Sequence, residues 1–501
     1  MQSNDAIFKT LCEHLRDAAR LESTAELLEW DERTGMPRGD ADFRAEQVTQ
    51  LRGMVHRLRT APEVKEWLEA LSTWDAAKDP HSPIGATLHH LNRDYQRATR
   101  LPSELVEAIA GATVRGQGTW DAARRADDYS QFQPSLDEML GLKREAAMAI
   151  RDDDQTPYEA MLDEYEPGAK ERELTDLFRA LRTALVPLID ELPQASKAID
   201  MSPIRQSFPI GGQARLSHRL AQAIGFDFNR GRLDTTSHPF CTTLGPSDCR
   251  ILTRYDSDHL PTSVFGTLHE AGHGLYEQGL PIQWYGLPPG QFASLGIHES
   301  QSRLWENLVG RTLPFAEFAL PIFHECLPDL KLTSAAELHA CFQHVAPSLI
   351  RVEADEATYN LHILIRFELE QALFANDLST DDLPVAWADA YETTLGIRPP
   401  SAADGVLQDV HWSAGLIGYF PTYSLGNLAA AQLMATARDS MPSMDDEFRN
   451  GKFDGLLHWL REHIHQHGRC YTAAELVERA TGRPLSIDPL MESLRNRYLA
   501  N

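Results

Sequence analysis

Two histidines four residues apart, with a glutamate directly after the first, stand in the segment Leu268-His269-Glu270-Ala271-Gly272-His273-Gly274. Because residues i and i+4 share one face of a helix, His269 and His273 can direct ring nitrogens at a single metal ion. Glu270 lies about 100° further around the helix, where its carboxylate can accept a proton from a water molecule. The segment therefore predicts a helix that carries two metal ligands and a general base.

A catalytic zinc site needs a third protein ligand and one open position. We expect Glu299 to be this ligand, because a carboxylate from a following helix completes a tripod that one helix alone makes awkwardly. The alternatives are His298, its neighbour in the sequence, and Glu277, which lies four residues beyond His273.

The elements that position these residues are expected to be mostly helical. Hydrophobic periodicity predicts metal-site helices at about 262–278 and 294–311, separated by a loop rich in glycine and proline. The stretch 210–255 is richer in turn signals and predicts a small β element near the site. The fold class is mainly α, and residues 1–501, with no linker dividing them, are expected to form one catalytic domain with two lobes flanking a groove.

Composition disfavours two classes of partner. The chain has 47 basic and 73 acidic residues, a formal charge of −26, which disfavours nucleic acid and anionic membranes as partners. The first residues show no basic segment followed by an apolar core, and we find no apolar run of membrane-spanning length, so a cytoplasmic protein is expected. The six cysteines are scattered without a Cys-x-x-Cys pair and are interpreted as reduced, mostly buried thiols.

A peptidase acting on a free C-terminus must neutralise a carboxylate, which the planar fork of arginine does well. Arg351 is our candidate, on a predicted helix 350–373 where it heads a polar stripe. The alternative is that this stripe is only a solvated helix face. His238, which precedes a proline, and Tyr419 or Tyr423 are candidate donors to the oxyanion of the transition state; each could instead be structural.

Taken together, these motifs resemble the carboxypeptidase Taq family of metal-dependent carboxypeptidases over nearly the whole chain. The strings that carry the resemblance are Trp30-Asp31, Met36-Pro37, 163–168, 238–240, the metal motif, 298–301, 350–355 and 405–412. Within such strings we also place Gln301, His411 and Arg250 among the expected substrate-binding residues. One departure is visible, since the threonine expected two residues after Arg250 appears one position late, as Thr253.

The resemblance implies a specific biochemistry. It assigns His269, His273 and Glu299 as metal ligands and Glu270 as catalytic base, with one zinc, or alternatively cobalt, per chain. The implied activity is release of single C-terminal residues from peptides that have a free C-terminus, with broad specificity that usually spares proline. The implied fold is helical with a deep substrate groove, related to angiotensin-converting and neurolysin-like peptidases, and the implied assembly is a homodimer.

Two other functions compete with this interpretation. An oligopeptidase or dipeptidyl carboxypeptidase could use the same metal site, and product lengths would separate it from a carboxypeptidase. A non-catalytic peptide-binding protein with a structural metal is a second alternative. The presence of Glu270 argues against it, because a closed structural site has no need of a base.

Overall fold

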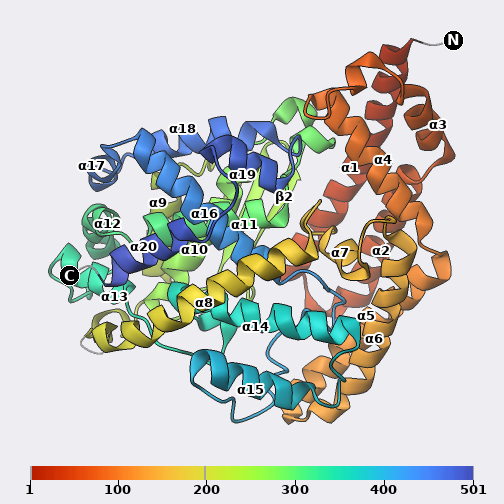
Figure 1. Ribbon diagram of the computed structural model, residues 1–501. Coiled ribbons are helices and arrows are strands. Elements are labelled where there is room, and N and C mark those ends of the chain that lie inside the picture. Colours follow the sequence, from red (N-terminus) through yellow and green to blue (C-terminus); the bar gives the residue numbers. More distant parts are fainter. Residues whose placement is uncertain (1–2, 197–198, 500–501) are drawn as a thin grey trace. The chain divides into compact units, whose positions relative to one another are not determined.

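The computed structural model describes residues 3–196 and 199–499, which form helices and one small sheet (Figure 1). Helices contain 67% of the chain and strands 3%, so the expectation of a mainly α fold with a minor β element is confirmed. No helix within these described ranges is both long enough and apolar enough to cross a membrane.

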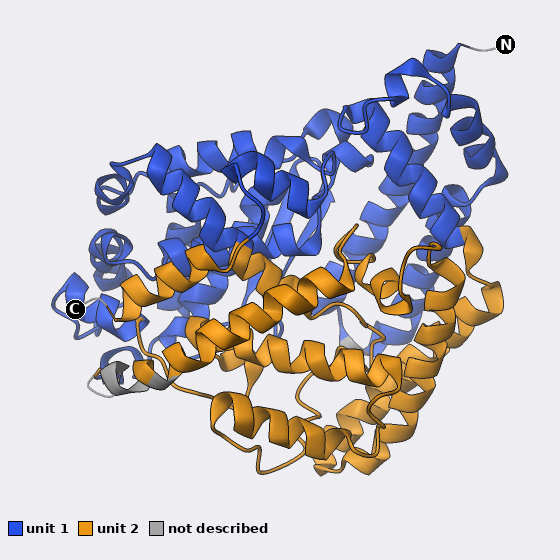
Figure 2. Ribbon diagram, viewed as in Figure 1, with its two compact units in different colours: residues 1–98, 200–342, 429–485 blue, residues 99–199, 343–428, 486–501 orange. Residues whose placement is uncertain are grey.

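The chain divides into two compact units, each built from three separate stretches of sequence (Figure 2). Unit 1 comprises residues 1–98, 200–342 and 429–485, and unit 2 comprises residues 99–199, 343–428 and 486–501. The single catalytic domain with two lobes that the sequence suggested stays a prediction.

The helices lying wholly or mostly in unit 1 are α1 Asn4–Thr34, α2 Ala41–Arg59, α3 Pro62–Leu71, α4 Pro83–Arg100, α9 Ile210–Ala223, α10 Leu260–Glu277, α11 Leu295–Arg303, α12 Leu313–Cys326, α13 Ala335–Phe342, α16 Pro421–Ser440, α17 Met444–Arg449, α18 Asp454–His463 and α19 Ala473–Thr481. Those of unit 2 are α5 Ser103–Ala126, α6 Gln133–Ile150, α7 Pro157–Leu162, α8 Glu171–Ser196, α14 Glu356–Ala375, α15 Leu383–Leu395 and α20 Asp488–Tyr498.

The sheet belongs to unit 1 and has the strand order β1-β3-β2. Its strands are β1 Gly231–Thr235, β2 Phe240–Gly245 and β3 Asp248–Thr253. The central strand β3 pairs parallel with β1 and antiparallel with β2. It packs against α10, so the sheet supports the helix that carries the histidine pair.

The β element is shorter than the stretch 210–255 that the sequence suggested, because Ile210–Ala223 is a helix. The pair Gly211-Gly212, one of the turn signals in that stretch, lies inside α9 and makes no turn. A Cβ atom on Gly212 would lie 2.7 Å from the carbonyl oxygen of Cys326, so this glycine allows α9 to pack closely on the end of α12. A glycine that serves close packing and one that serves a turn have the same sequence signal.

The histidine helix α10 owes its orientation to an apolar stripe. Val264, Leu268, Ala271 and Leu275 recur every three or four residues and are all 0% exposed. Burial of this face fixes the rotation of the helix and leaves the positions of His269 and His273 on another face.

Candidate active site

The two helices α10 and α11 approach each other closely at Gly272. A Cβ atom at this position would lie 2.6 Å from the carbonyl oxygen of Gln301 and 2.6 Å from the Cα of Ser302. Only glycine fits there without moving the backbone. The glycine between the two histidines therefore lets α11 bring Glu299 up to the histidine pair.

Three potential ligand atoms converge at this contact. Oε2 of Glu299 lies 3.6 Å from Nε2 of His269 and 3.5 Å from Nε2 of His273. These separations exceed a hydrogen bond but match the roughly 3.3–3.6 Å expected between two ligands held at 2.0–2.2 Å around one tetrahedral ion. The residues present therefore fit a divalent cation.

Hydrogen bonds on the far side of each imidazole fix its orientation. Nδ1 of His269 donates to Oε2 of Glu306 at 2.9 Å, and Nδ1 of His273 donates to the backbone carbonyl of His298 at 3.0 Å. With each Nδ1 acting as a donor, the lone pair of each neutral ring is on Nε2, which faces Glu299.

Glu306 lies on a π-helical stretch, Leu304–Val309, that directly continues α11. Its carboxylate also accepts from Nη1 of Arg303 at 3.2 Å and pairs with Nη2 of Arg311 at 3.6 Å. Burial opposes ionisation, but Arg303, His269 and Arg311 outweigh it and lower the pKa of Glu306 to about 2. Glu306 is thus a permanent anion behind His269.

The charges around the two histidines differ. Burial, reinforced by His298 and His269, lowers the pKa of His273 well below its usual value, which keeps this ring neutral and able to bind a metal. Burial acts in the same direction on His269, but Glu299 and Glu306 outweigh it and raise the pKa of that ring. The negative charge that favours a proton there also favours a cation.

Glu270 is buried beside this cluster, with 6% of its surface exposed. Among the described residues, its Oε2 atom has no hydrogen-bond partner. Burial raises the pKa of Glu270 to about 7, and Glu299 and Glu306 add to this rise while His269 opposes it. A carboxylate with a pKa near neutrality can accept a proton and release it again.

His298 and Glu277, the two alternatives for the third ligand, form a hydrogen bond with each other. Nε2 of His298 donates to Oε1 of Glu277 at 3.0 Å, and Oε2 of Glu277 accepts from Thr243 at 3.0 Å. His269, His273 and Glu299 are the one cluster of three potential ligands that converges within residues 3–196 and 199–499.

In unit 2, Arg351 lies in a short 3-10 turn, Arg351–Glu353, and not in the helix as the sequence suggested. Asp355 caps α14 by accepting a hydrogen bond from the backbone N–H of Thr358, so the helix begins at Glu356. The prediction that the helix begins at residue 350 failed because the polar residues keep their helical spacing through the cap at Asp355. The backbone before this cap is not α-helical. The solvated-face alternative does not hold for Arg351, which is 6% exposed.

The guanidinium group of Arg351 is held by neighbouring side chains. Nε donates to Oδ1 of Asp409 at 2.9 Å, and Nη1 donates to the hydroxyl of Tyr359 at 3.0 Å. The other carboxylate oxygen of Asp409 accepts from Nε of Arg366 at 2.6 Å. Burial opposes ionisation of Asp409, but the two arginines outweigh it and hold its pKa well below the usual range.

His411 and Tyr423 share a hydrogen bond of 3.1 Å between Nε2 and the phenol oxygen. Burial, with Arg351 nearby, lowers the pKa of His411 to about 3, so this imidazole is neutral. The ring of Tyr419 packs against both residues, with centroid separations of 5.4 Å in each case. Arg351 lies over the ring of Tyr423, 5.0 Å from its centroid. These four candidates are therefore neighbours in unit 2.

The remaining candidates belong to unit 1 and lie in different surroundings. His238 is exposed in the turn between β1 and β2. Arg250 forms a double hydrogen bond with Asp248, at 3.0 and 2.9 Å, and stacks on Trp30. Gln301 is 0% exposed and bonds both Ser300 and His465. A direct contact between Gln301 and a substrate would require the side chains that cover it to move.

Comparison with known proteins identifies the family. Residues 10–498 match the family described as "Carboxypeptidase Taq (M32) metallopeptidase". The chain belongs to this family. It is therefore a metallocarboxypeptidase, a peptide hydrolase whose chemistry involves a divalent metal. The resemblance inferred from the sequence motifs is confirmed.

Individual relatives match over nearly the whole length of both chains. The chain is 42% identical to "Thermostable carboxypeptidase 1" of Thermus thermophilus, covering 99% of both chains. It is 36% identical to "Carboxypeptidase 1" of Bacillus subtilis, covering 94% of both. The fold superposes on the crystal structure of the M32 carboxypeptidase from Deinococcus radiodurans R1 with a TM-score of 0.95 at 38% identity, covering 98% of this chain and 99% of that one.

Sequence reasoning missed several residues that support the site of this M32 carboxypeptidase. Glu306 was not singled out, although Glu299, Arg303 and Glu306 recur at spacings of four and three residues and could have indicated a continued polar face. Asp409 was seen only as part of a family string. Its bridge between two arginines depends on contacts between distant segments, for which the sequence carries no local signal.

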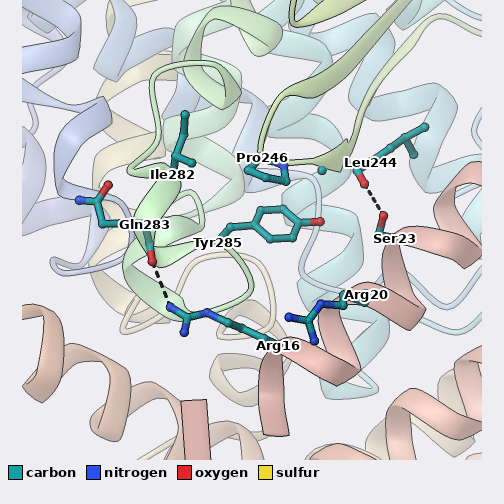
Figure 3. A pocket seen from close by; sticks show the side chains of 9 residues that line it. Arg16, Arg20, Ser23, Leu244, Pro246, Ile282, Gln283 and Tyr285 are labelled. Atoms are coloured by element: carbon teal, nitrogen blue, oxygen red, sulfur yellow. Dashed lines mark hydrogen bonds between the residues drawn. The ribbon is translucent and has the colours of Figure 1, made fainter. Parts of the chain in front are cut away.

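A separate pocket of about 420 Å³ lies in unit 1 (Figure 3). Its walls come from α1, from the end of β2 and from the segment after α10. Nη2 of Arg16 donates to the carbonyl oxygen of Gln283 at 3.0 Å, and Ser23 donates to the carbonyl oxygen of Leu244. None of the candidate site residues lines this pocket.

Proposed function

We propose that this metallocarboxypeptidase removes amino acids one at a time from peptides with a free C-terminus, with broad specificity. In this proposal His269, His273 and Glu299 hold one cation per chain, and Glu270 is the general base. The observation that carries the proposal is the convergence of two imidazole nitrogens and one carboxylate oxygen beside the buried carboxylate of Glu270, whose Oε2 atom has no hydrogen-bond partner in the part of the chain that the structure describes.

Two nitrogen ligands and one oxygen ligand suit zinc, and cobalt is the second choice for the same donor set. When bound, such a cation supplies Lewis acidity, which polarises the scissile carbonyl and lowers the pKa of water. Glu270 accepts a proton from the attacking water and delivers it to the leaving amine. Glu306 and the carbonyl of His298 keep the two imidazoles in the orientation that binding requires.

Arg351 is proposed to anchor the terminal carboxylate of the peptide. Its charge is fixed by Asp409, and its Nη1 atom is oriented by Tyr359, which supports a pre-organised anion-binding group. His411, Gln301 and Arg250 are further candidates for peptide contacts. His238, Tyr419 and Tyr423 are candidates for the donor to the oxyanion.

The test is a time course on one defined peptide of about ten residues, made both as the free acid and as the C-terminal amide. Mass spectrometry should show a ladder of single-residue losses from the free acid and almost none from the amide. A chelator should stop the ladder, and added zinc or cobalt should restore it. Internal fragments, or losses of two residues at a time, would instead indicate an oligopeptidase or a dipeptidyl carboxypeptidase.

We also propose a homodimer, as the family resemblance implies, and a cytoplasmic location. The six free cysteines fit a reducing compartment. Light scattering coupled to size-exclusion chromatography tests the dimer, and cell fractionation tests the location.

A further inference from the structure

Two thiols meet across the small sheet of unit 1. Cys241 on β2 and Cys249 on β3 have their sulfur atoms 3.7 Å apart. Cys241 lies opposite Ile251 and Cys249 lies opposite Thr243, so the two cysteines are diagonal neighbours on one face of an antiparallel pair. The sulfur atoms are in van der Waals contact, and both cysteines are free thiols.

The pair adjoins the helix that carries the histidines. The thiol of Cys249 points at the carbonyl oxygen of Gly274, 3.9 Å away, and Gly274 directly follows His273. A Cβ atom on Gly274 would lie only 3.0 Å from Cγ2 of Ile251 on the same strand. Because α10 and β3 pack without free space, a shift of β3 must be passed to α10 or absorbed by strain.

We propose that Cys241 and Cys249 form a redox-active dithiol site, which a peroxide converts into a disulfide between β2 and β3. Cys241 is partly exposed, whereas Cys249 is 3% exposed. Because Cys241 is the more exposed residue of the two, we expect a small oxidant to reach its thiol first, and the Cys249 thiol is in contact with it to complete the reaction.

The chemistry uses one hydrogen peroxide molecule and no other reactant. The Cys241 thiolate attacks one peroxide oxygen, the O–O bond breaks, and a sulfenic acid and water result. The Cys249 thiolate then attacks the sulfenic sulfur and displaces the oxygen as a second water. Two thiols have lost two electrons and two protons in total, and the peroxide has been reduced to two waters.

Closing this bond must change the local structure. A disulfide needs a sulfur–sulfur distance of about 2.05 Å, which is about 1.6 Å shorter than the contact in the reduced protein. Side-chain rotation can take up part of this difference, and β3 takes up the rest. Since a displacement of about 1 Å at a catalytic group can cost up to about a hundredfold in rate, we expect oxidation to lower kcat/KM about tenfold.

The experiment exposes the metal-loaded enzyme to graded hydrogen peroxide at about pH 9. An alkaline pH is chosen because the hydrogen bond with Cys249 and burial raise the pKa of the Cys241 thiol well above its usual value. Remaining thiols are alkylated, and a non-reducing digest is analysed by mass spectrometry. We expect a linked peptide pair containing Cys241 and Cys249, and an activity loss that dithiothreitol reverses.

Two variants serve as controls. Cys249→Ala should abolish both the linked pair and the reversible loss, whereas Cys470→Ala, a buried cysteine outside the sheet, should behave as the wild type. If Cys249→Ala does not fold, Cys241→Ser removes the other partner, and the linked pair in the wild type remains a direct readout that does not depend on activity. Oxidation of Cys241 without a linked pair would overturn the proposal, and a linked pair that leaves kcat/KM unchanged would overturn the expected transmission of the disulfide to α10.

Discussion

Oε2 of Glu306 accepts a hydrogen bond from Nδ1 of His269 at 2.9 Å. Glu299, seven residues earlier in the chain, faces Nε2 on the opposite side of the same ring. The ring is therefore held between two carboxylates. One of them faces the candidate cation position, and the other sets the orientation and basicity of the imidazole.

Replacing Glu306 should weaken metal binding without removing a ligand. Glu306→Ala is expected to lower zinc affinity ten- to a hundredfold, because His269 loses its orienting acceptor. Glu306→Gln should lose less, since an amide oxygen can still accept the bond. Competition with a chromophoric chelator measures the affinity. Glu277→Gln is the matched control, because Glu277 also accepts a hydrogen bond from an imidazole, that of His298. The zinc affinity of this variant should change little.

Glu270→Gln tests the general base directly. The variant should keep its metal while kcat falls by about 10²–10⁴-fold, because an amide cannot accept the proton of water. Metal content by elemental analysis and turnover of a free-acid peptide give the two readouts. Near-normal turnover with bound metal would reject Glu270 as the base.

Arg351→Ala should discriminate between substrates with and without a terminal carboxylate. We expect kcat/KM for a free-acid peptide to fall about a hundredfold and that for the matched amide to change far less. Arg250→Ala tests, in the same assay, the other arginine among the candidates for peptide contacts, which forms a double hydrogen bond with Asp248. Equal losses on both substrates of Arg351→Ala would mean that Arg351 supports the fold and does not bind the carboxylate.

Glu370 in unit 2 predicts a pH dependence of stability. This carboxylate is 0% exposed and accepts hydrogen bonds from Tyr158, Trp412 and the backbone of Gly418, each at 2.8 Å. Burial raises its pKa from 4.5 to about 7 against the effect of these donors. The folded state therefore binds this proton more tightly than the unfolded state, and stability is lost as pH rises from about 4.5 to about 7.

Glu370→Gln removes this titration. The free energy of unfolding of the wild type relative to the variant should fall by roughly 2–3 kcal/mol between pH 5 and pH 8. Denaturant unfolding followed by tryptophan fluorescence at both pH values measures it. A difference that stays constant with pH would show that Glu370 keeps one protonation state throughout this range.

Local periodicity was enough to predict the parts of the site that lie on single helices. The spacing of His269 and His273 depends only on helix geometry, and Ser294 caps α11 through its side chain as helix-start residues commonly do. The errors at Ile210 and Arg351 arose where one residue pattern fits two backbones, so only packing decides between them.

The residues that support the site could not be derived in the same way. Asp409 and Glu370 act through partners more than forty residues away in the chain, for example Arg351 and Trp412 respectively. Such contacts depend on how helices pack, and no local sequence pattern specifies that. The position of Glu306 depends in addition on the change from α-helix to π-helix at Leu304, which the amino-acid composition of the segment does not predict.

The π-helical turn at Leu304–Val309 accommodates one residue more than an α-helical turn would. A π-helical turn absorbs its extra residue locally, so removing one residue would return the backbone to regular winding while the helix beyond keeps its rotation relative to α11. The extra residue therefore changes only the directions of the side chains inside the turn, and Glu306, whose carboxylate meets Nδ1 of His269, is one of them. The carboxylate behind the first histidine thus depends on a local departure from regular winding as well as on the identity of the residue.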